Sequence, residues 1–237
     1  VQECVTGALS FNGQRCTALK IIFLHDSVYD DFMASFVQKI DDLVLGLPWV
    51  PGVNLTPLPE IGKPVWLDEL VKDALEKGAN VVNKKGGIIN ETSFFPIVLE
   101  NVNREMRIYH EEQFGPVIPV IRYSDVQEPM DYIVKSNFGQ QASIFGEDPK
   151  QISLLVDTLA NQVCRVNINS QCQRGPDVFP FTGRKDSAEG TLSVSDALRV
   201  FSIRSLVALK ESDFNKKILS DILDGRHSNF LSTDFIL

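Results

Sequence analysis

Residues 17–24, TALKIIFL, and residues 27–43, SVYDDFMASFVQKIDDL, decide the fold class of this chain. The first run is short, apolar and rich in β-branched residues, which is typical of a buried strand. The second run opens with Ser27 as a helix N-cap and Asp30 at the capping-box position. One apolar face then repeats at helical spacing through Val28, Phe32, Phe36, Ile40 and Leu43.

The same alternation of strand and helix continues along the chain. Further strands are expected at residues 79–82, 95–99, 117–122, 142–145, 163–168 and 202–210. Further helices are expected from Pro64 up to Gly78, from Ser124 with Gln127 toward Lys135, and from Asp148-Pro149 onward. Strands that alternate with helices predict an α/β domain with a largely parallel sheet and flanking helices, here followed by a C-terminal extension.

Composition narrows the classes of protein to which this chain belongs. Of its 237 residues 43% are hydrophobic and 23% are charged, as in globular domains. With 23 basic and 31 acidic side chains the formal charge is −8, which argues against a nucleic-acid partner. No apolar run approaches the roughly 20 residues of a membrane-spanning helix, so no membrane partner is expected. The 4 cysteines and 3 histidines are scattered, which predicts no metal site and reduced thiols in the cytoplasm.

The sequence FNGQRCT at residues 11–17 combines a nucleophile with a turn. Gly13 permits a tight backbone close to a ligand. The positive charge of Arg15 favours the thiolate form of Cys16, and backbone N–H groups around such a turn stabilise an oxyanion. The competing interpretation is a small core cysteine, and this motif alone leaves both open.

The sequence HEEQFGPV at residues 110–117 is a second candidate. Glu111 and Glu112 are paired carboxylates of the kind that performs acid–base work. Two adjacent glutamates on a loop are more often simply solvated, so the pair by itself decides nothing. Phe114 stands on a rigid turn, because Gly115 and Pro116 follow it.

The sequence INSQCQRGPDVFPFTG at residues 168–183 is the third candidate. Arg174 offers a guanidinium to an anion from a loop, and Phe179 and Phe181 are able to line a pocket. A surface loop anchored by two buried aromatic rings is the alternative interpretation.

Taken together, the three stretches resemble the catalytic half of an aldehyde dehydrogenase, with a match from about residue 9 to residue 210. Residues 11–16 resemble the cysteine motif of that family and EEQFGPV resembles its cofactor-facing motif. The later family segments are matched by SNFGQQASIF at residues 136–145 and by FPFTGRKDS at residues 179–187. Within the family, GQRCT, NVNREMRIYHEEQFGPV and CQRGPDVFPF are most similar to the non-phosphorylating glyceraldehyde-3-phosphate dehydrogenases. The resemblance implies a three-layer fold.

The resemblance also implies a reaction centred on Cys16. This thiol would attack an aldehyde carbonyl to give a thiohemiacetal, and its own backbone N–H would help to hold the oxyanion. Hydride would pass to NADP or NAD, leaving a thioester that water hydrolyses. Glu112 matches the carboxylate that binds the nicotinamide-side ribose hydroxyls, and Phe114 matches the ring beside it.

Three more residues have substrate-binding roles by the same resemblance. Phe181 matches an aromatic wall of the substrate pocket. Arg15 and Arg174 match arginines that grip the substrate phosphate, since two guanidinium groups recognise a dianion through directed hydrogen bonds. The implied substrate is glyceraldehyde 3-phosphate, which would be oxidised to 3-phosphoglycerate.

The chain also departs from the family pattern. The nucleotide-binding domain of the family precedes the cysteine motif, whereas 15 residues precede Cys16 here. Residues 1–201 are therefore interpreted as the catalytic domain alone, residues 202–210 as a strand that joins a homo-oligomer, and residues 211–237 as an extension. The glutamate that activates water and the asparagine of the oxyanion hole also belong upstream, so the isolated chain is expected to be inactive. Another anionic aldehyde as substrate, or a non-catalytic assembly domain, remain the alternatives.

Overall fold

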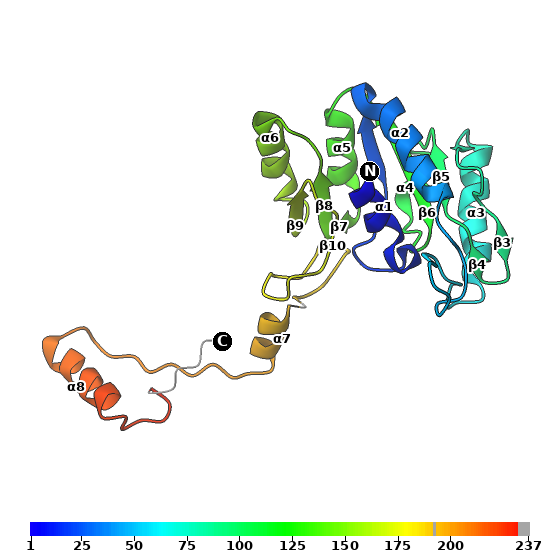
Figure 1. Cartoon of the computed structure of the whole chain (residues 1–237). Helices are drawn as coiled ribbons and strands as arrows, with labels where there is room; N and C mark the ends of the chain where they lie inside the picture. Colours follow the sequence, from blue (N-terminus) through cyan, green and yellow to red (C-terminus); the bar gives the residue numbers. More distant parts are fainter. Residues whose placement is uncertain (192, 232–237) are drawn as a thin grey trace.

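A four-stranded sheet forms the centre of the molecule (Figure 1). In the computed structural model, which describes residues 1–191 and 193–231, its strands lie in the order β1-β6-β5-β2. The strands span Ile22–His25 (β1), Val117–Tyr123 (β6), Ile97–Glu100 (β5) and Asn80–Val81 (β2). β6 runs parallel to β1 and to β5, whereas β2 is antiparallel to β5. The prediction of a largely parallel sheet is confirmed.

Helices cover both faces of this sheet, because the side chains of its central strands alternate between the faces. Val98 of β5 and Val120 of β6 are buried against α1 and α2. Leu99 and Val117, on the opposite face, are buried against α3. These helices span Gln2–Leu9 (α1), Asp26–Asp41 (α2) and Lys63–Glu76 (α3). The expected three-layer fold is therefore present.

A smaller α/β portion extends the body on the side of β1 (Figure 1). Its parallel strands are β8 (Gln141–Ile144) and β9 (Arg165–Ile168), joined by α6 (Pro149–Leu159). Ile144, Leu159 and Val163 form its buried core. The remaining elements of the body are β3 (Ile89–Asn90), β4 (Ser93–Phe94), α4 (Arg107–His110), α5 (Gln127–Lys135), β7 (Phe138–Gly139) and β10 (Arg184–Lys185).

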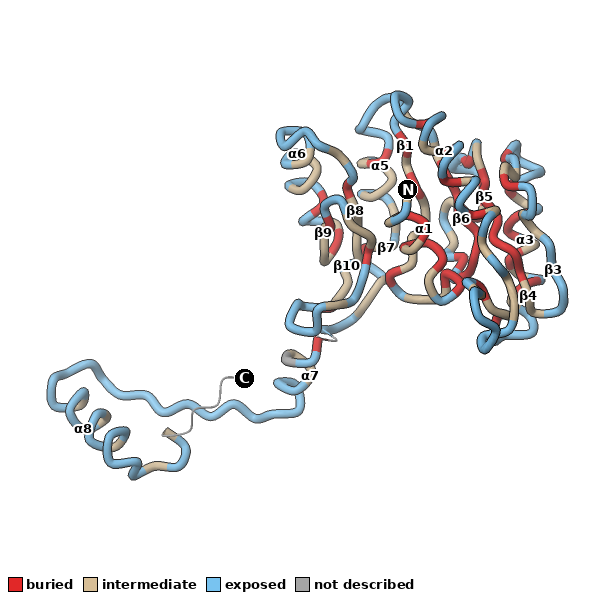
Figure 2. The backbone as a smooth tube through the Cα atoms, viewed as in Figure 1, coloured by how far each residue is buried: buried red, intermediate tan, exposed pale blue. Residues whose placement is uncertain are grey.

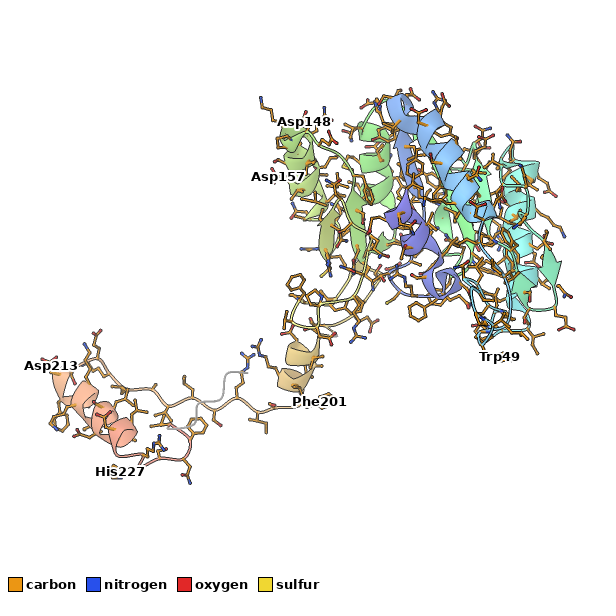
Figure 3. All side chains as sticks on the ribbon, viewed as in Figure 1. Trp49, Asp148, Asp157, Phe201, Asp213 and His227 are labelled. Atoms are coloured by element: carbon orange, nitrogen blue, oxygen red, sulfur yellow. The ribbon has the colours of Figure 1, made fainter. Side chains whose placement is uncertain are left out.

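Beyond β10 the chain leaves the body as an exposed arm, seen in Figures 1 and 2 and carrying the labelled Phe201 and Asp213 in Figure 3. Its helices are α7 (Val194–Val200) and α8 (Asp213–Asp224). Residues 202–210, predicted as a strand, pair with no strand in the part of the chain that the structure describes. A strand needs a neighbour to take its backbone hydrogen bonds, and this segment has no such neighbour among the described residues. No helix among the described residues is long and apolar enough to cross a membrane.

The structure corrects two of the predicted helix starts. His25, rather than Ser27, is the N-cap of α2, and its Nδ1 atom accepts a hydrogen bond from the backbone N–H of Ser27 at 3.1 Å. Ahead of α5, Asp125 rather than Ser124 accepts the hydrogen bond from the Gln127 N–H. In both cases a neighbouring side chain has the better reach to the free N–H groups of the first turn.

The first predicted strand also begins later than its composition indicates. Only its last residues, together with His25, form β1, because the backbone ahead of Ile22 is bonded elsewhere. The N–H of Leu19 donates to the carbonyl of Gly7 in α1 at 3.1 Å, and the carbonyl of Lys20 accepts from the side chain of Gln113 at 2.8 Å. Residues 17–21 therefore belong to the loop that carries the cysteine.

Candidate active site

The loop that carries Cys16 is held in an unusual backbone conformation. Phe11, Asn12 and Gly13 have φ values of 54°, 57° and 71°, in the left-handed region. The side chain of Asn12 fixes this conformation, because it exchanges hydrogen bonds of 3.0 Å with the side chain and the N–H of Thr56. A Cβ atom on Gly13 would lie 2.8 Å from the carbonyl oxygen of Gly115. Glycine therefore permits direct contact between the cysteine loop and the loop of residues 110–117.

Cys16 is the exposed thiol among four free cysteines, all of which the structure describes. Cys4 and Cys172 are buried, and burial raises the pKa of both thiols, to about 11 for Cys4. Cys164 is half-buried. The backbone N–H of Cys16 donates no hydrogen bond within the described residues, so it is free to bind an oxyanion.

Arg15 joins two other segments of the chain. Its Nη2 atom donates to the carbonyl of Gly7 and to Oε1 of Gln171, each at 3.2 Å. The N–H of Gln171 in turn donates to Glu3 of α1 at 2.8 Å. Arg15 is therefore a structural link between α1 and the loop of residues 169–183, and Gln171 is a contact that the sequence did not reveal.

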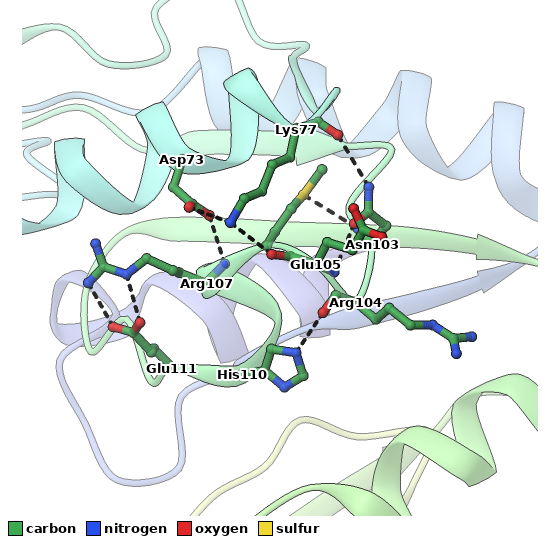
Figure 4. Close-up of polar contacts among 9 residues, drawn as sticks. Asp73, Lys77, Asn103, Arg104, Glu105, Arg107, His110 and Glu111 are labelled. Carbon is green, nitrogen blue, oxygen red and sulfur yellow. Dashed lines mark hydrogen bonds and ion pairs between the residues drawn. The ribbon is translucent and has the colours of Figure 1, made fainter.

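The two adjacent glutamates have different surroundings, and Figure 4 shows those of Glu111. Glu111 is paired with Arg107 through bonds of 2.7 and 2.9 Å, and this hydrogen bonding holds the pKa of Glu111 below its usual value. The backbone of Arg107 is itself anchored, since its N–H donates to Asp73 of α3 at 2.8 Å. Glu112 is exposed and forms no hydrogen bond or ion pair within the described residues. Its carboxylate is therefore available to a ligand.

Phe114, two residues further on, is also held toward solvent. Its φ of 40° is in the left-handed region, which is uncommon for an aromatic residue, and its side chain is 37% exposed. Close packing at the next position requires a glycine, because a Cβ atom on Gly115 would lie 2.8 Å from the side chain of Leu67. Lys63 of α3 lies 5.9 Å from the centre of the Phe114 ring.

A small pocket lies where the two loops meet. The residues that line it are Gly13, Arg15, Ala18, Leu19, Lys20, Glu112, Gln113 and Phe114. Gln113 is buried, and its Oε1 atom has no hydrogen-bond partner in the described residues. Of the polar groups of Glu112 and Gln113, the exposed carboxylate of Glu112 is the one that a ligand with hydroxyl groups is able to reach.

Lys20 is the residue of this region that sequence reasoning missed. Its Nζ atom donates to the carbonyls of Ile108, at 3.1 Å, and Glu111. Burial lowers its pKa to about 8, an effect that Glu112 and Glu111 oppose. Because the unfolded chain holds this proton more tightly, the buried charge costs stability at neutral pH, and that cost falls as the pH rises from about 8 toward the ordinary value of 10.5. The sequence signal that could have revealed Lys20 is its charge, which is the single charge within the apolar run TALKIIFL.

The other two predicted substrate residues lie in the loop of residues 169–183. Arg174 is exposed, and its guanidinium carbon lies 5.3 Å from the centre of the Phe181 ring. Phe181 itself is buried. Arg165 of β9 holds this loop, because it donates to the carbonyls of Gln173 and Gly175 at 3.0 and 2.8 Å. The structure thus connects Arg15 to this loop through Gln171, but it does not place the Arg15 guanidinium against Arg174.

Comparison with known proteins assigns the family. The sequence pattern described as "Aldehyde dehydrogenase family" matches residues 1–206. The chain belongs to the aldehyde dehydrogenase family. Among the described residues, no group of three or more His, Cys, Asp or Glu side chains is placed to hold a metal ion.

The relatives of this aldehyde dehydrogenase chain are much longer than the chain itself. It is 35% identical to the NADP-dependent glyceraldehyde-3-phosphate dehydrogenase of Apium graveolens, over 84% of this chain and 39% of that protein. It is also 35% identical to the enzyme of the same name from Streptococcus equinus, over 90% of this chain and 43% of that protein. A solved structure of NADP-dependent glyceraldehyde-3-phosphate dehydrogenase from Bacillus halodurans, complexed with NADP, superposes with a TM-score of 0.78. It is 36% identical, over 83% of this chain and 40% of the other. The chain spans about two fifths of the length of these relatives.

Proposed function

We propose that this chain is the catalytic domain of an NADP-dependent aldehyde dehydrogenase that oxidises glyceraldehyde 3-phosphate to 3-phosphoglycerate. The observation that carries the proposal is the meeting of two loops at one pocket. One loop exposes the thiol of Cys16, which follows the pocket-lining residue Arg15, and the other lines the pocket with the free carboxylate of Glu112 and the ring of Phe114. The similarity to relatives named for this activity supports the choice of substrate.

In the proposed reaction the sulfur of Cys16 attacks the aldehyde carbon and forms a C–S bond. The carbonyl oxygen becomes an oxyanion, which the free N–H of Cys16 stabilises. Collapse of this thiohemiacetal expels hydride and leaves a thioester on Cys16. Attack of water on the thioester breaks the C–S bond and releases the acid and the thiol. NADP, when bound, supplies the acceptor for the hydride.

The residues that would hold NADP are those of the second loop. Glu112 would accept hydrogen bonds from the ribose hydroxyls, because its carboxylate is exposed and unpaired in the described residues. Phe114 would pack beside the nicotinamide end. The pairing of Glu111 with Arg107 supports the choice of Glu112 as the ribose-binding residue, since it leaves Glu112 as the free carboxylate of the two.

The substrate phosphate would be bound from the loop of residues 169–183. Arg174 is exposed and lies over Phe181, so its guanidinium is free to rotate toward a dianion. Arg15 would contribute through its Nη groups or through Gln171, to which it donates a hydrogen bond. The nucleotide-binding domain, the water-activating glutamate and the oxyanion asparagine would be supplied by a part that corresponds to the upstream region of the longer relatives.

The substrate assignment predicts a preference that can be measured. For the protein purified at its natural length, whose intact mass is measured first, we expect NADPH to form with glyceraldehyde 3-phosphate. Its kcat/KM is expected to exceed that for a carboxylate semialdehyde at least about tenfold, since a dianion gains more from two arginines than a monoanion does. A preference for the semialdehyde would establish another anionic substrate. Absence of NADPH formation with either aldehyde would favour an assembly domain.

Self-association is a second expectation, and it rests on the arm. Residues 202–210 are exposed, with Ile203 97% and Leu206 88% accessible, and the backbone groups of residues 203–209 form no hydrogen bond within the described chain. We propose that this segment adds as a strand to a second subunit, which would satisfy those groups and cover the apolar side chains. Light scattering is expected to show a dimer or a larger homo-oligomer. A monomer across micromolar concentrations would contradict this role.

A further inference from the structure

Lys20 is a half-buried cation that the proposed reaction does not use. It interrupts an apolar run, and its ammonium group lies 5.2 Å from the centre of the Phe138 ring. Burying a charge is costly unless donors and acceptors are matched, and a methionine or leucine would fill the same space without that cost. The ammonium is matched by the carbonyls of Ile108 and Glu111, which lie 88 and 91 positions away in the sequence. These hydrogen bonds therefore hold the loop that precedes β6.

The connection between the two loops runs in both directions. Lys20 donates through its side chain to the backbone of Glu111, and Gln113 donates through its side chain to the backbone of Lys20 at 2.8 Å. A second bond from the Gln113 amide, to the carbonyl of Val117 at 2.9 Å, ties the same side chain to the start of β6. Glu112 lies between these two anchored residues, with its backbone fixed on both sides and its carboxylate exposed.

We propose that Lys20 is a positioning residue, which fixes Glu112 and Phe114 relative to Cys16 and so aligns the cofactor-binding loop with the nucleophile. Lys20 follows Cys16 by four positions in the same loop, so the clamp joins the loop that carries the nucleophile to the residues on either side of Glu112. The inference rests on the proposed function, because it takes Glu112 as a ligand of NADP. Burial lowers the pKa of Lys20 to about 8, which means that the charged form costs folding stability at neutral pH. Such a cost is consistent with an ammonium group that is needed for its hydrogen bonds to the loop.

The test compares Lys20→Met with Lys39→Met in the protein at its natural length. Methionine keeps the apolar stem of Lys20 and removes its donors, whereas Lys39 is an exposed lysine of α2 and serves as the matched control. Three quantities are measured: the dissociation constant of NADP, the melting temperature, and the rate of Cys16 alkylation by iodoacetamide without NADP. For Lys20→Met we expect NADP binding at least about tenfold weaker, with a melting temperature within a few degrees of the parent and an alkylation rate within about twofold. Lys39→Met is expected to match the parent, and Lys20→Arg to recover part of the affinity.

Each other outcome contradicts the inference. A folded Lys20→Met protein that binds NADP as the parent does would show that the clamp positions nothing. If Lys20→Met does not fold, Gln113→Leu replaces it, since this variant removes the bonds from Gln113 and keeps the lysine. Unchanged NADP affinity in folded Gln113→Leu, or loss of the fold in both variants, would show that these bonds stabilise the core and do not position the cofactor-binding loop. If the parent protein itself fails to bind NADP, the proposed function is wrong and the inference falls with it, so the two failures are distinguished.

Discussion

Aldehyde oxidation is expected to fall by a factor of about 10,000 or more when Cys16 is replaced by alanine in the protein at its natural length. The loss is large because no covalent intermediate forms without the thiol, and hydride transfer from an aldehyde needs the negative charge of the thiohemiacetal oxygen. The measurement is kcat with glyceraldehyde 3-phosphate and NADP, accompanied by a melting curve that shows the variant to be folded.

The control for this prediction is Cys164→Ala. Cys164 is half-buried, whereas Cys4 and Cys172 are buried, so Cys164 is the second most accessible thiol of the chain. Its replacement is expected to leave kcat unchanged. In the native protein, iodoacetamide should place its first label on Cys16 and abolish activity in proportion. Activity of Cys16→Ala above a tenth of the parent value, or activated-ester turnover that survives this substitution, would show that another group performs the chemistry.

The second large effect concerns substrate choice, and it is expected for Arg174→Ala. Arg174 is exposed and its recorded contact is with the Phe181 ring, so its removal leaves the backbone and the pocket wall in place. A charge-assisted hydrogen bond contributes about 1.5–3 kcal/mol, which corresponds to roughly a 10- to 100-fold lower kcat/KM for glyceraldehyde 3-phosphate. Unphosphorylated glyceraldehyde lacks the dianion, so its kcat/KM is expected to change less than about twofold.

Arg226→Ala is the matched control, because Arg226 is an exposed arginine of the arm. It is expected to leave both specificity constants unchanged. Arg15→Ala is a poorer test, since Arg15 also donates to Gly7 and Gln171 and its removal would disturb the contact between α1 and the loop. If Arg174→Ala keeps the full preference for the phosphorylated aldehyde, the phosphate assignment is wrong for this residue.

Sequence reasoning reached the fold class and several helix ends, because these depend on residues close together in the chain. The spacing of apolar residues around Phe36 predicted α2, and this side chain is fully buried against the sheet. Asp148 was expected to start α6, and its carboxylate accepts from the N–H of Lys150 at 2.9 Å. Gly78, with a φ of 101°, ends α3 as its position indicated. Such signals are read within one or two turns of the chain.

The candidate site was predicted in part, and the gaps share one cause. The motifs predicted Cys16, and the residues alone left Glu111 and Glu112 undistinguished, whereas the family resemblance selected Glu112. The structure adds that Glu111 is paired with Arg107, and that arginine is anchored by Asp73, 34 positions away. The cap at His25 instead of Ser27 shows the same limit at short range, because the His25 ring accepts the hydrogen bond of the Ser27 N–H itself and the helix therefore begins earlier.

By itself, the sequence determined that this chain forms an α/β domain of the aldehyde dehydrogenase type. It also indicated which polar and charged residues are candidates for the site. The tertiary structure decided which of those groups are free and which are held. Periodicity and turn chemistry are local, whereas the partner of a side chain depends on where distant segments meet. The contacts of Lys20 with Ile108 and Glu111 and that of Gln113 with Lys20 span 88 to 93 positions, so only the folded chain brings these groups together.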